Sequence, residues 1–270
     1  SSAGSYDVSL VTTNSNECKD SVTNLVTVYP RAIISFQGDS VCLGQPITFI
    51  NTSQTSSSLI TYLWSFGDGS NSSLNSPTYN FSSSGDFFVT LSTISPGPSG
   101  TTGCIDTLQQ KIVIYPTPIA SFNANNECKY DSVVFQNTTD TVIPNLTFTW
   151  DFDNGQFSNS YSPNHLYQSA NNYTVELNVS SDYGCGSNVS KNIDLYPIPT
   201  SNFTFSNECL GNAINFFNTS TSIYNLTYDW SFGDNTINGT TQDVSHFYSV
   251  SDTFNVQLII SSVYNCLDTV

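Results

Sequence analysis

Apolar and polar residues alternate along most of the chain in short runs, and turn residues such as Gly, Asn, Asp and Pro separate the runs. Alternation with a period of two predicts β-strands that bury one face. Within residues 117–197 the pattern predicts strands at residues 120–123, 132–136, 146–152, near Phe157, 165–167, 173–179 and 188–196. No helix is predicted. Seven short strands in about 80 residues favour an all-β Greek-key sandwich of the immunoglobulin type.

The pattern recurs along the chain. Trp64, Trp150 and Trp230 are 86 and 80 residues apart, and Tyr-Pro pairs recur between them. The first interval is longer because the loop at residues 95–100 carries an insertion. A tryptophan on the third strand is typical of this kind of sandwich, so all three are predicted to be structural core. The period predicts tandem sandwiches in an extended array.

The repeats are out of register with the ends of the sequence. Residues 1–30 match the last two strands of a preceding repeat, residues 31–116 and 117–197 are two whole repeats, and residues 198–270 are a repeat that lacks its last strand. Two strands alone bury too little surface to be stable. We therefore expect the sequence to be a window cut from a longer chain, whose neighbouring repeats are its partners.

Composition narrows the classes of function. Five Lys and Arg stand against 21 Asp and Glu, which gives a net charge of −16. A nucleic-acid binder or a protein that docks on anionic lipid needs the opposite sign, so neither is expected. No apolar run approaches the ~18 residues of a membrane helix, so no membrane insertion is expected in this segment. Aromatic residues reach 13%, which is typical of a folded chain.

Cysteines occupy two positions of the repeat. One lies between the first two strands, and the other lies in the turn between the last two; the first group is Cys42, Cys128 and Cys209, and the second is Cys18, Cys104, Cys185 and Cys266. Seven cysteines in a Lys-poor chain indicate an oxidising compartment. The odd number leaves at least one cysteine free or bonded outside this sequence.

The third strand and its turn carry a motif that begins at each tryptophan: Trp64-Ser-Phe-Gly-Asp-Gly, Trp150-Asp-Phe-Asp-Asn-Gly and Trp230-Ser-Phe-Gly-Asp-Asn. His165-Leu-Tyr and His246-Phe-Tyr follow, and then strands such as Tyr173-Thr-Val-Glu-Leu. These motifs resemble the PKD domain, whose hallmarks are W-x-F-G-D-G, H-x-Y and G-x-Y-x-V-x-L. The second repeat departs from them with Asp153-Asn154, and the first has Thr78 in place of the histidine.

Finer features resemble the PKD arrays of Bacteroidota surface proteins, including gliding adhesins exported by the type IX secretion route. They are the cysteine before the second strand, the Cys-x-Asp-Thr turn and the Tyr-Pro-x-Pro linkers. The resemblance implies an extracellular, cell-surface location, with attachment to the outer membrane through other parts of the chain. It also implies a stalk that presents a distal adhesive tip.

Candidate chemistry is sparse. His165 and His246 are the only histidines, and they lie a full repeat apart, so they cannot share a metal or a catalytic role. Asp68 and its equivalents are interpreted as turn residues. The sequence therefore predicts no enzyme, no cofactor and no metal site.

One short motif, Asp-Ser/Thr-aliphatic, occurs more often than its surroundings would suggest. Asp-Ser/Thr-aliphatic triplets resemble the O-glycosylation acceptor of Bacteroidota, and the alternative is chance in a chain rich in these residues. The predicted acceptors are Ser21, Ser40, Thr107, Ser132, Thr141 and Thr269.

Two disulfide schemes remain open. Pairing within each repeat gives Cys42 with Cys104, Cys128 with Cys185 and Cys209 with Cys266. If seven strands alternate in direction, however, the two cysteines of one repeat lie at opposite ends, beyond the ~7 Å Cα separation that a disulfide allows. Pairing between neighbouring repeats then gives Cys42 with Cys185 and Cys128 with Cys266, and leaves the other three for repeats outside this sequence. The second scheme requires the short fourth strand near Phe157.

Two classes of function follow. A structural stalk is favoured, because the repeats share framework motifs. The alternative is a module that binds carbohydrate or protein, or accessory domains of a secreted enzyme. A polysaccharide or surface ligand is then expected elsewhere in the chain.

Overall fold

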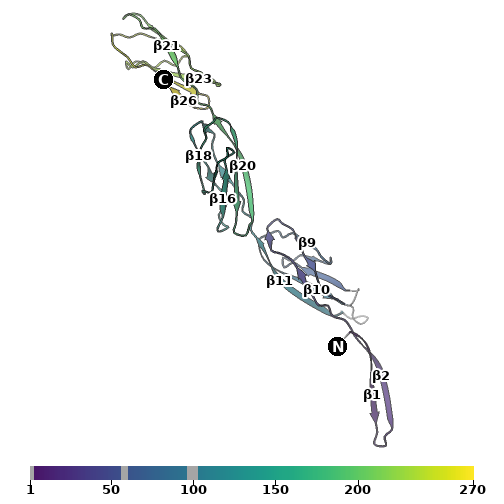
Figure 1. Cartoon of the computed structure of the whole chain (residues 1–270). Coiled ribbons are helices and arrows are strands. Elements are labelled where there is room, and N and C mark those ends of the chain that lie inside the picture. The colour runs from purple at the N-terminus through teal and green to yellow at the C-terminus, as the bar shows by residue number, and fades with distance from the viewer. Residues whose placement is uncertain (1–2, 56–59, 96–102) are drawn as a thin grey trace. The chain divides into compact units, whose positions relative to one another are not determined.

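The computed structural model describes residues 3–55, 60–95 and 103–270. The chain divides into two compact units, Ser1–Thr117 and Pro118–Val270, and each is described by itself. All regular elements of the described residues are β-strands, and they form tandem immunoglobulin-like sandwiches (Figure 1), which confirms the predicted fold class. The insertion predicted in the loop at residues 95–100 lies, apart from Ser95, outside the described residues.

Unit 1 contains a hairpin and the first repeat. The hairpin pairs β1 (Gly4–Thr13) with β2 (Lys19–Val28) along their full length, and both faces are exposed. The repeat has one five-stranded sheet in the order β4-β11-β10-β7-β8, and two short ladders, β3-β6 and β5-β9, lie opposite. Its strands are β3 (Phe36–Gln37), β4 (Val41–Cys42), β5 (Ile47–Thr48), β6 (Ile50–Asn51), β7 (Thr61–Ser65), β8 (Asn71–Ser72), β9 (Thr78–Tyr79), β10 (Gly85–Ile94) and β11 (Ile105–Tyr115).

The second repeat, in unit 2, has the same topology. Its five-stranded sheet has the order β13-β20-β19-β16-β17, and the ladders β12-β15 and β14-β18 form the other layer. The strands are β12 (Phe122–Asn123), β13 (Glu127–Cys128), β14 (Ser132–Val134), β15 (Gln136–Asn137), β16 (Thr147–Asp151), β17 (Phe157–Ser158), β18 (Asn164–Leu166), β19 (Asn172–Ser180) and β20 (Gly186–Tyr196). All seven predicted strands are present, and β13 is an addition that the alternation did not predict.

The third repeat, also in unit 2, has shorter strands at its C-terminal side. They are β21 (Phe203–Phe205), β22 (Ile214–Asn218), β23 (Leu226–Ser231), β24 (Val244–His246), β25 (Gln257–Ser262) and β26 (Leu267–Thr269). Here β21-β22-β24 form one layer and β23-β25-β26 the other. The strand β25 begins at Gln257, whereas its counterpart β19 begins at Asn172, four positions earlier in the repeat.

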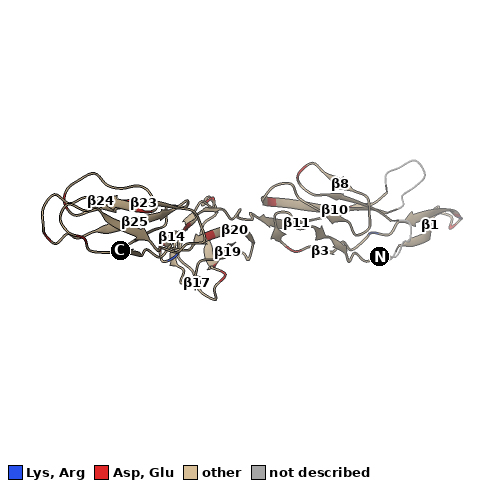
Figure 2. Ribbon diagram, turned by 90° about the horizontal axis from the view of Figure 1, so that it is seen from above, with Lys and Arg blue, Asp and Glu red and all other residues tan. Residues whose placement is uncertain are grey.

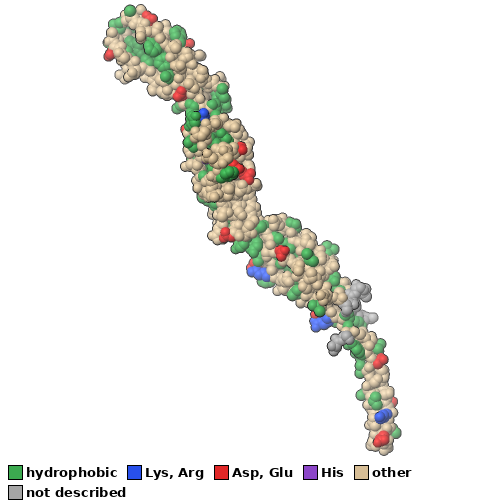
Figure 3. Space-filling view, in the orientation of Figure 1, with side chains coloured by type: hydrophobic (Ala, Val, Ile, Leu, Met, Phe, Trp, Pro, Cys, Tyr) green, Lys and Arg blue, Asp and Glu red, His purple; other side chains and the backbone are tan. Residues whose placement is uncertain are grey.

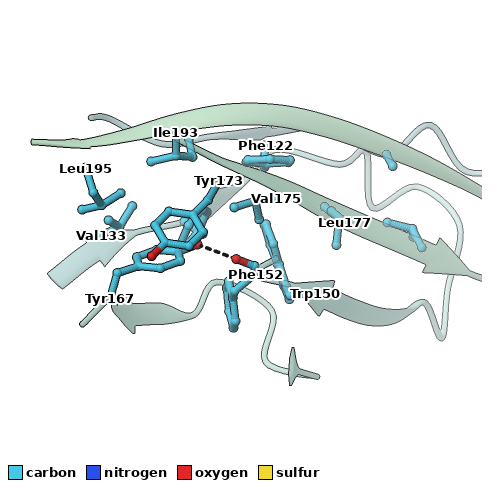
Figure 4. Close-up of a cluster of buried hydrophobic side chains, with 13 residues drawn as sticks. Phe122, Val133, Trp150, Phe152, Tyr167, Tyr173, Val175, Leu177, Ile193 and Leu195 are labelled. Atoms are coloured by element: carbon cyan, nitrogen blue, oxygen red, sulfur yellow. Dashed lines mark hydrogen bonds between the residues drawn. The ribbon is translucent and has the colours of Figure 1, made fainter. Parts of the chain in front are cut away.

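Each repeat buries its tryptophan at the centre of an aromatic core. Trp64, Trp150 and Trp230 are fully buried. Each indole N–H donates to a backbone carbonyl of the loop that follows the turn, as Trp150 Nε1 does to Ser160 O at 2.9 Å. Figure 4 shows this core in the second repeat, where the rings of Tyr167 and Tyr173 stack at 4.1 Å. The indole N–H of each tryptophan thus has a hydrogen-bond partner inside an otherwise apolar core.

The surface is polar with few basic side chains. In Figure 2 the coloured charged residues are scattered along the ribbon, and the space-filling view of Figure 3 is mostly tan, the colour of the backbone and of side chains that are neither hydrophobic nor charged. Five Lys and Arg against 21 Asp and Glu make the chain acidic overall. Like charge at this density keeps a chain soluble but does not define a docking site.

Candidate functional site: the junction between repeats

Neighbouring repeats of unit 2 are joined by a disulfide. Cys128 of the second repeat is bonded to Cys266 of the third, with Cα atoms 5.6 Å apart, across a sequence separation of 138 residues. Cys266 is buried. The bond therefore closes a loop that contains most of both repeats, and we call it the junction staple.

Strand pairing brings both cysteines to the linker. The short strand β13 runs parallel to the end of β20, with Cys128 opposite Tyr196, and the Lys129 amide donates to Tyr196 O at 2.7 Å. Cys266 lies in the turn from β25 to β26, where its amide donates to Ser262 Oγ at 3.2 Å. The first turn of one repeat and the last turn of the next therefore meet beside the residues that connect the repeats.

Three tyrosines pack around the same junction. The rings of Tyr196 and Tyr264 stack with centroids 3.7 Å apart and an interplanar angle of 4°. The ring of Tyr224 meets that of Tyr264 edge-on at 4.9 Å. Tyr196 begins the Tyr-Pro-x-Pro linker, and Tyr264 lies two residues before Cys266. Aromatic packing and the disulfide thus restrain the same short linker.

The residue two positions after the turn cysteine anchors the beginning of its own repeat. Asp268 accepts hydrogen bonds from the amide and the hydroxyl of Ser201, at 2.6 and 2.8 Å. The hydrogen bond from the Ser201 amide lowers the pKa of Asp268 most strongly. In the first repeat the equivalent Asp106 forms an ion pair with Arg31. Both contacts tie the start of a repeat to its last hairpin.

The bonds in the structure decide against pairing within repeats. Cys128 and Cys266 are bonded to each other, so the pairs Cys128 with Cys185 and Cys209 with Cys266 are wrong. Cys42 with Cys104 is also wrong, because Cys104 is free in the described chain, as are Cys18 and Cys209. Cys42 and Cys185 are each disulfide-bonded. The physical reason is strand direction, since β17 is present and the two cysteines of a repeat lie at opposite ends.

A second recurring feature is a ring held over the Trp-x-Phe turn. Tyr79, His165 and His246 each stack on the phenylalanine of that motif at 4.0 Å. Each also bonds a turn side chain: Tyr79 to Asp68 at 2.6 Å, His165 to Asn154 at 2.9 Å and His246 to Asp234 at 2.7 Å.

Tyr79, not Thr78, therefore takes the place of the histidine in the first repeat, and the assignment to Thr78 is wrong. The ladders give the register, since Tyr79 pairs with Ile47 as His165 pairs with Val133.

The pKa shifts of the side chains at these turns fit a structural role. Partial burial works to raise the pKa of Asp234, but hydrogen bonds from Thr236 and His246 outweigh it and lower that pKa to about 2. Burial also opposes the lowering of the Asp68 pKa, which hydrogen bonds from Tyr79 and Ser70 bring about. Burial lowers the pKa of His165. Each group is thus held in the protonation state that its turn partner requires at neutral pH.

A shallow groove of about 380 Å³ lies beside the junction in unit 2 and includes Tyr196 and Tyr224. Asp194 lines it and accepts from Asn172 Nδ2 at 2.6 Å, and its amide donates to Asn126 Oδ1 at 2.9 Å. In the first repeat, Val113 and Ser40 stand at the positions of Asp194 and Asn126. The second repeat therefore has a polar cluster of its own beside two aromatic rings, which the framework motifs did not reveal.

The remaining sequence candidates stay separate. His165 and His246 lie in different repeats, each with its own turn partner. The described residues contain no group of three or more His, Cys, Asp or Glu placed to hold a metal ion. Within the same residues, no helix is long and apolar enough to cross a membrane. The predicted acceptors of O-glycosylation are all exposed: Ser21, Ser40, Thr107, Ser132, Thr141 and Thr269.

Comparison with known proteins matches most of the chain to one domain family. The family model described as PKD domain matches residues 30–112, 115–195 and 198–269. The PKD1 domain of Vibrio anguillarum Epp is 30% identical over 29% of this chain and 93% of its own, with a TM-score of 0.27. Sidekick-1 immunoglobulin domains 1–5 are 11% identical over 99% of this chain and 65% of their own chain, with a TM-score of 0.33. Drosophila N-cadherin EC1-4 is 10% identical over 98% of this chain and 81% of its own, with a TM-score of 0.28.

Proposed function

Because this chain belongs to the PKD domain family, we propose that it is a structural stalk segment of a large bacterial cell-surface adhesin, which holds a distal adhesive tip away from the cell. Its disulfides and immunoglobulin-like domains indicate an extracellular protein. The motif resemblance to Bacteroidota surface arrays supports export by the type IX route and attachment to the outer membrane through other parts of the chain.

The junction staple carries the proposal. Tension applied at the two ends of unit 2 enters at residue 118 and leaves at residue 270, and the Cys128–Cys266 bond is a covalent shortcut between them. The residues inside the loop are taken out of the path of the force. A stalk has to keep its length under load, and a disulfide between neighbouring repeats provides this better than one within a repeat.

We extend the same staple to the other repeats by position. Cys42 and Cys185 stand in their repeats where Cys128 and Cys266 stand in theirs, so we propose that they are partners. Cys18, Cys104 and Cys209 are then the halves of staples to repeats outside this sequence. An array built this way has a continuous covalent reinforcement that passes from repeat to repeat.

Single-molecule force spectroscopy tests this function. The full chain carries Cys42→Ala and Cys185→Ala throughout, because the proposed Cys42–Cys185 bond would otherwise hold part of the same loop closed. It is pulled from its ends, first oxidised and then with Cys128→Ala/Cys266→Ala added. The variant is expected to gain about 480 Å of contour length on unfolding that the oxidised chain does not, because 138 residues at ~3.5 Å each become extensible. Cys18→Ala is the matched control, since this cysteine is free and exposed. Equal contour lengths with and without the staple would show that the bond carries no force and would refute the proposal.

The polar cluster of the second repeat favours a second candidate, binding of a neutral polysaccharide. Asp194, its partner Asn172 and the ring of Tyr224 line one groove. Carboxylate, amide and aromatic groups are those that recognise sugars by hydrogen bonding and stacking. Nuclear magnetic resonance titration with soluble polysaccharides tests it. Shifts at Asp194 that Tyr224→Ala abolishes would support binding, whereas an unchanged spectrum at saturating polysaccharide would exclude it.

A further inference from the structure

The chain contains two Asn-Gly dipeptides, Asn154-Gly155 in the second repeat and Asn238-Gly239 in the third. An asparagine before a glycine is prone to deamidation, because the backbone nitrogen of the next residue can attack the side-chain Cγ and glycine has no side chain to obstruct the approach. Both asparagines are exposed. Exposure therefore does not distinguish the two dipeptides, and the groups that contact them must.

The backbone nitrogen of Gly155 is free to act as a nucleophile. It donates to no other group in the part of the chain that the structure describes. The space around Gly155 is open, since a Cβ added there would meet no atom within 4 Å. A hydrogen bond from the Phe152 amide to the carbonyl of Gln156, at 3.2 Å, closes the turn around it. The nitrogen is thus held in a defined turn without being engaged.

Two groups contact the side-chain amide of Asn154 where the reaction needs them. The Gln156 amide donates to Asn154 Oδ1 at 3.1 Å. This hydrogen bond folds the side chain back over the Gly155 peptide, and it places a donor at the oxygen on which negative charge develops during attack at Cγ. His165 Nε2 lies 2.9 Å from Asn154 Nδ2, the nitrogen that has to leave. A protonated imidazole at that distance can donate a proton to the leaving group.

The imidazole of His165 is fixed in this position by its surroundings. Its ring stacks on Phe152 at 4.0 Å and meets Tyr167 edge-on at 4.5 Å. Only 8% of the residue is exposed. Burial lowers the pKa of His165, so its protonated form gives up a proton more readily than a free imidazolium does. Nucleophile, oxyanion donor and acid therefore converge on one side chain.

The second dipeptide lacks all three features. The Gly239 amide donates to Trp230 O at 3.0 Å, so this nitrogen is engaged in a β-bridge. Asn238 Nδ2 donates to the carboxylate of Asp229 at 2.8 Å, and an ionised carboxylate has no proton for a leaving group. A Cβ added at Gly239 would come within 2.8 Å of Val244, so its surroundings are crowded. The chain thus carries its own matched control.

We propose that Asn154 is a self-deamidation site, at which the folded chain converts its own asparagine to aspartate. The Gly155 nitrogen forms a bond to Asn154 Cγ and loses its proton to water. His165 Nε2 donates a proton to Nδ2, the Cγ–Nδ2 bond breaks, and ammonia leaves behind a cyclic imide. One water opens the imide at either carbonyl to give aspartate or isoaspartate, and His165 regains its proton from solvent. The net reaction consumes one water, releases one ammonia and involves no oxidation.

The other two repeats show what an aspartate does at this position. They have Asp68 and Asp234 there, and Asp234 Oδ2 lies 2.7 Å from His246 Nε2. Deamidation of Asn154 therefore gives the second repeat the carboxylate–histidine pair of the third and adds one negative charge to its turn. This inference goes beyond the proposed stalk function and does not depend on it, because it uses only the turn and the side chains around it.

Mass spectrometry of the full chain after incubation at neutral pH tests the proposal. Cleavage by trypsin after Lys129 and Lys191 places Asn154 and Asn238 in separate peptides, and fragmentation locates the converted residue. In the folded chain Asn154 is expected to convert at least about tenfold faster than Asn238, because general acid catalysis alone provides that much. In denaturant the two dipeptides are expected to react at similar rates, with Asn154 slower than in the folded chain.

His165→Phe removes the acid and keeps a ring over Phe152. A six-membered ring fits there, since Tyr79 occupies the equivalent place in the first repeat. The variant is expected to slow conversion of Asn154 at least about tenfold, and His246→Phe, the same change in the third repeat, should leave that rate unchanged.

The comparison of folded and denatured parent chain needs no variant, so it decides even where His165→Phe does not fold. A rate at Asn154 that is no higher in the folded chain than in denaturant would overturn the proposal. Equal rates at the two asparagines of the folded chain would do the same, as would an unchanged rate in a His165→Phe chain that keeps its melting temperature.

Discussion

Removal of the junction staple is expected to lower the stability of unit 2 substantially. The perturbation is Cys128→Ala/Cys266→Ala, which takes away both sulfurs and leaves no buried polar group in their place. The bond spans 138 residues of sequence. A crosslink over a loop of that length restricts the unfolded chain by about 5 kcal/mol at 25 °C in the loop-entropy treatment.

The expected change in melting temperature follows from the size of the unit. Unit 2 runs from Pro118 to Val270, which is 270 − 117 = 153 residues. Proteins of this size lose about 2–4 °C per kcal/mol, so the loss of the staple is expected to lower the melting temperature by about 10–20 °C. Differential scanning calorimetry measures the shift, and denaturant titration with tryptophan fluorescence gives the free energy of unfolding.

The matched control is Cys18→Ala, because this cysteine is free and lies on the exposed hairpin. Its melting curve is expected to follow that of the parent chain. Reduction of a Cys42→Ala/Cys185→Ala chain should reproduce the effect of the double variant in that background if the bond, and not the cysteine side chains, is responsible, since reduction of the parent would also open the bonds of Cys42 and Cys185. A melting temperature for Cys128→Ala/Cys266→Ala within the error of the parent would refute the reasoning from loop closure.

Three further predictions concern single side chains. Trp150→Ala is expected to destabilise its repeat by about 3–5 kcal/mol, whereas Phe157→Ala, at an exposed position, should stay within about 0.5 kcal/mol in the same denaturant titration. Because burial lowers the pKa of His165, its contribution to stability is complete above pH 6.5 and is lost as the pH falls below that value; His165→Tyr should flatten the acid side of the melting temperature against pH. Gly67→Ala should cost more than Gly69→Ala in melting experiments: both have positive φ, about 1–2 kcal/mol of backbone strain, but only the first would place a Cβ within 2.9 Å of a backbone oxygen. Equal losses for the two glycines would contradict this contact.

The fold could be predicted from the sequence because the same alternation of apolar and polar residues recurs in all three repeats. The strand β13, at Glu127–Cys128, could not, since two residues show no period and its pairing partner lies almost 70 positions away in β20. In the first repeat, the sequence motif assigns the position over the Trp-x-Phe turn to Thr78, one residue before Tyr79, whose ring lies there. The motif counts along the sequence, whereas the ladder of Ile47 with Tyr79 sets which side chain faces the turn.

The groove that Asp194 lines could not be predicted from the sequence, for a different reason. Its members come from separate segments, with Asn126 before β13, Asn172 at the start of β19 and Asp194 near the end of β20. Each alone is an ordinary polar residue on a strand edge. Only the pairing of three strands brings them together, and a motif search along one segment has no signal for that.

The junction staple shows how one two-residue strand can decide which cysteines are bonded. The direction of every strand after the fourth depends on whether β17 exists, and β17 consists of Phe157 and Ser158, paired to Asp151 and Trp150. With it, the last turn of a repeat lies at the end opposite the first turn, and a bond within the repeat cannot form. The cysteine of the first turn then meets the next repeat instead, where Tyr196 and Tyr264 already stack. Deleting the two-residue strand and its turn should therefore do more than weaken one edge of the sheet. It should leave Cys128 and Cys266 unable to pair without rebuilding the repeat, and mass spectrometry of the refolded, oxidised chain would then find new cysteine pairs, whereas unchanged pairing would show that the linker alone sets the connectivity.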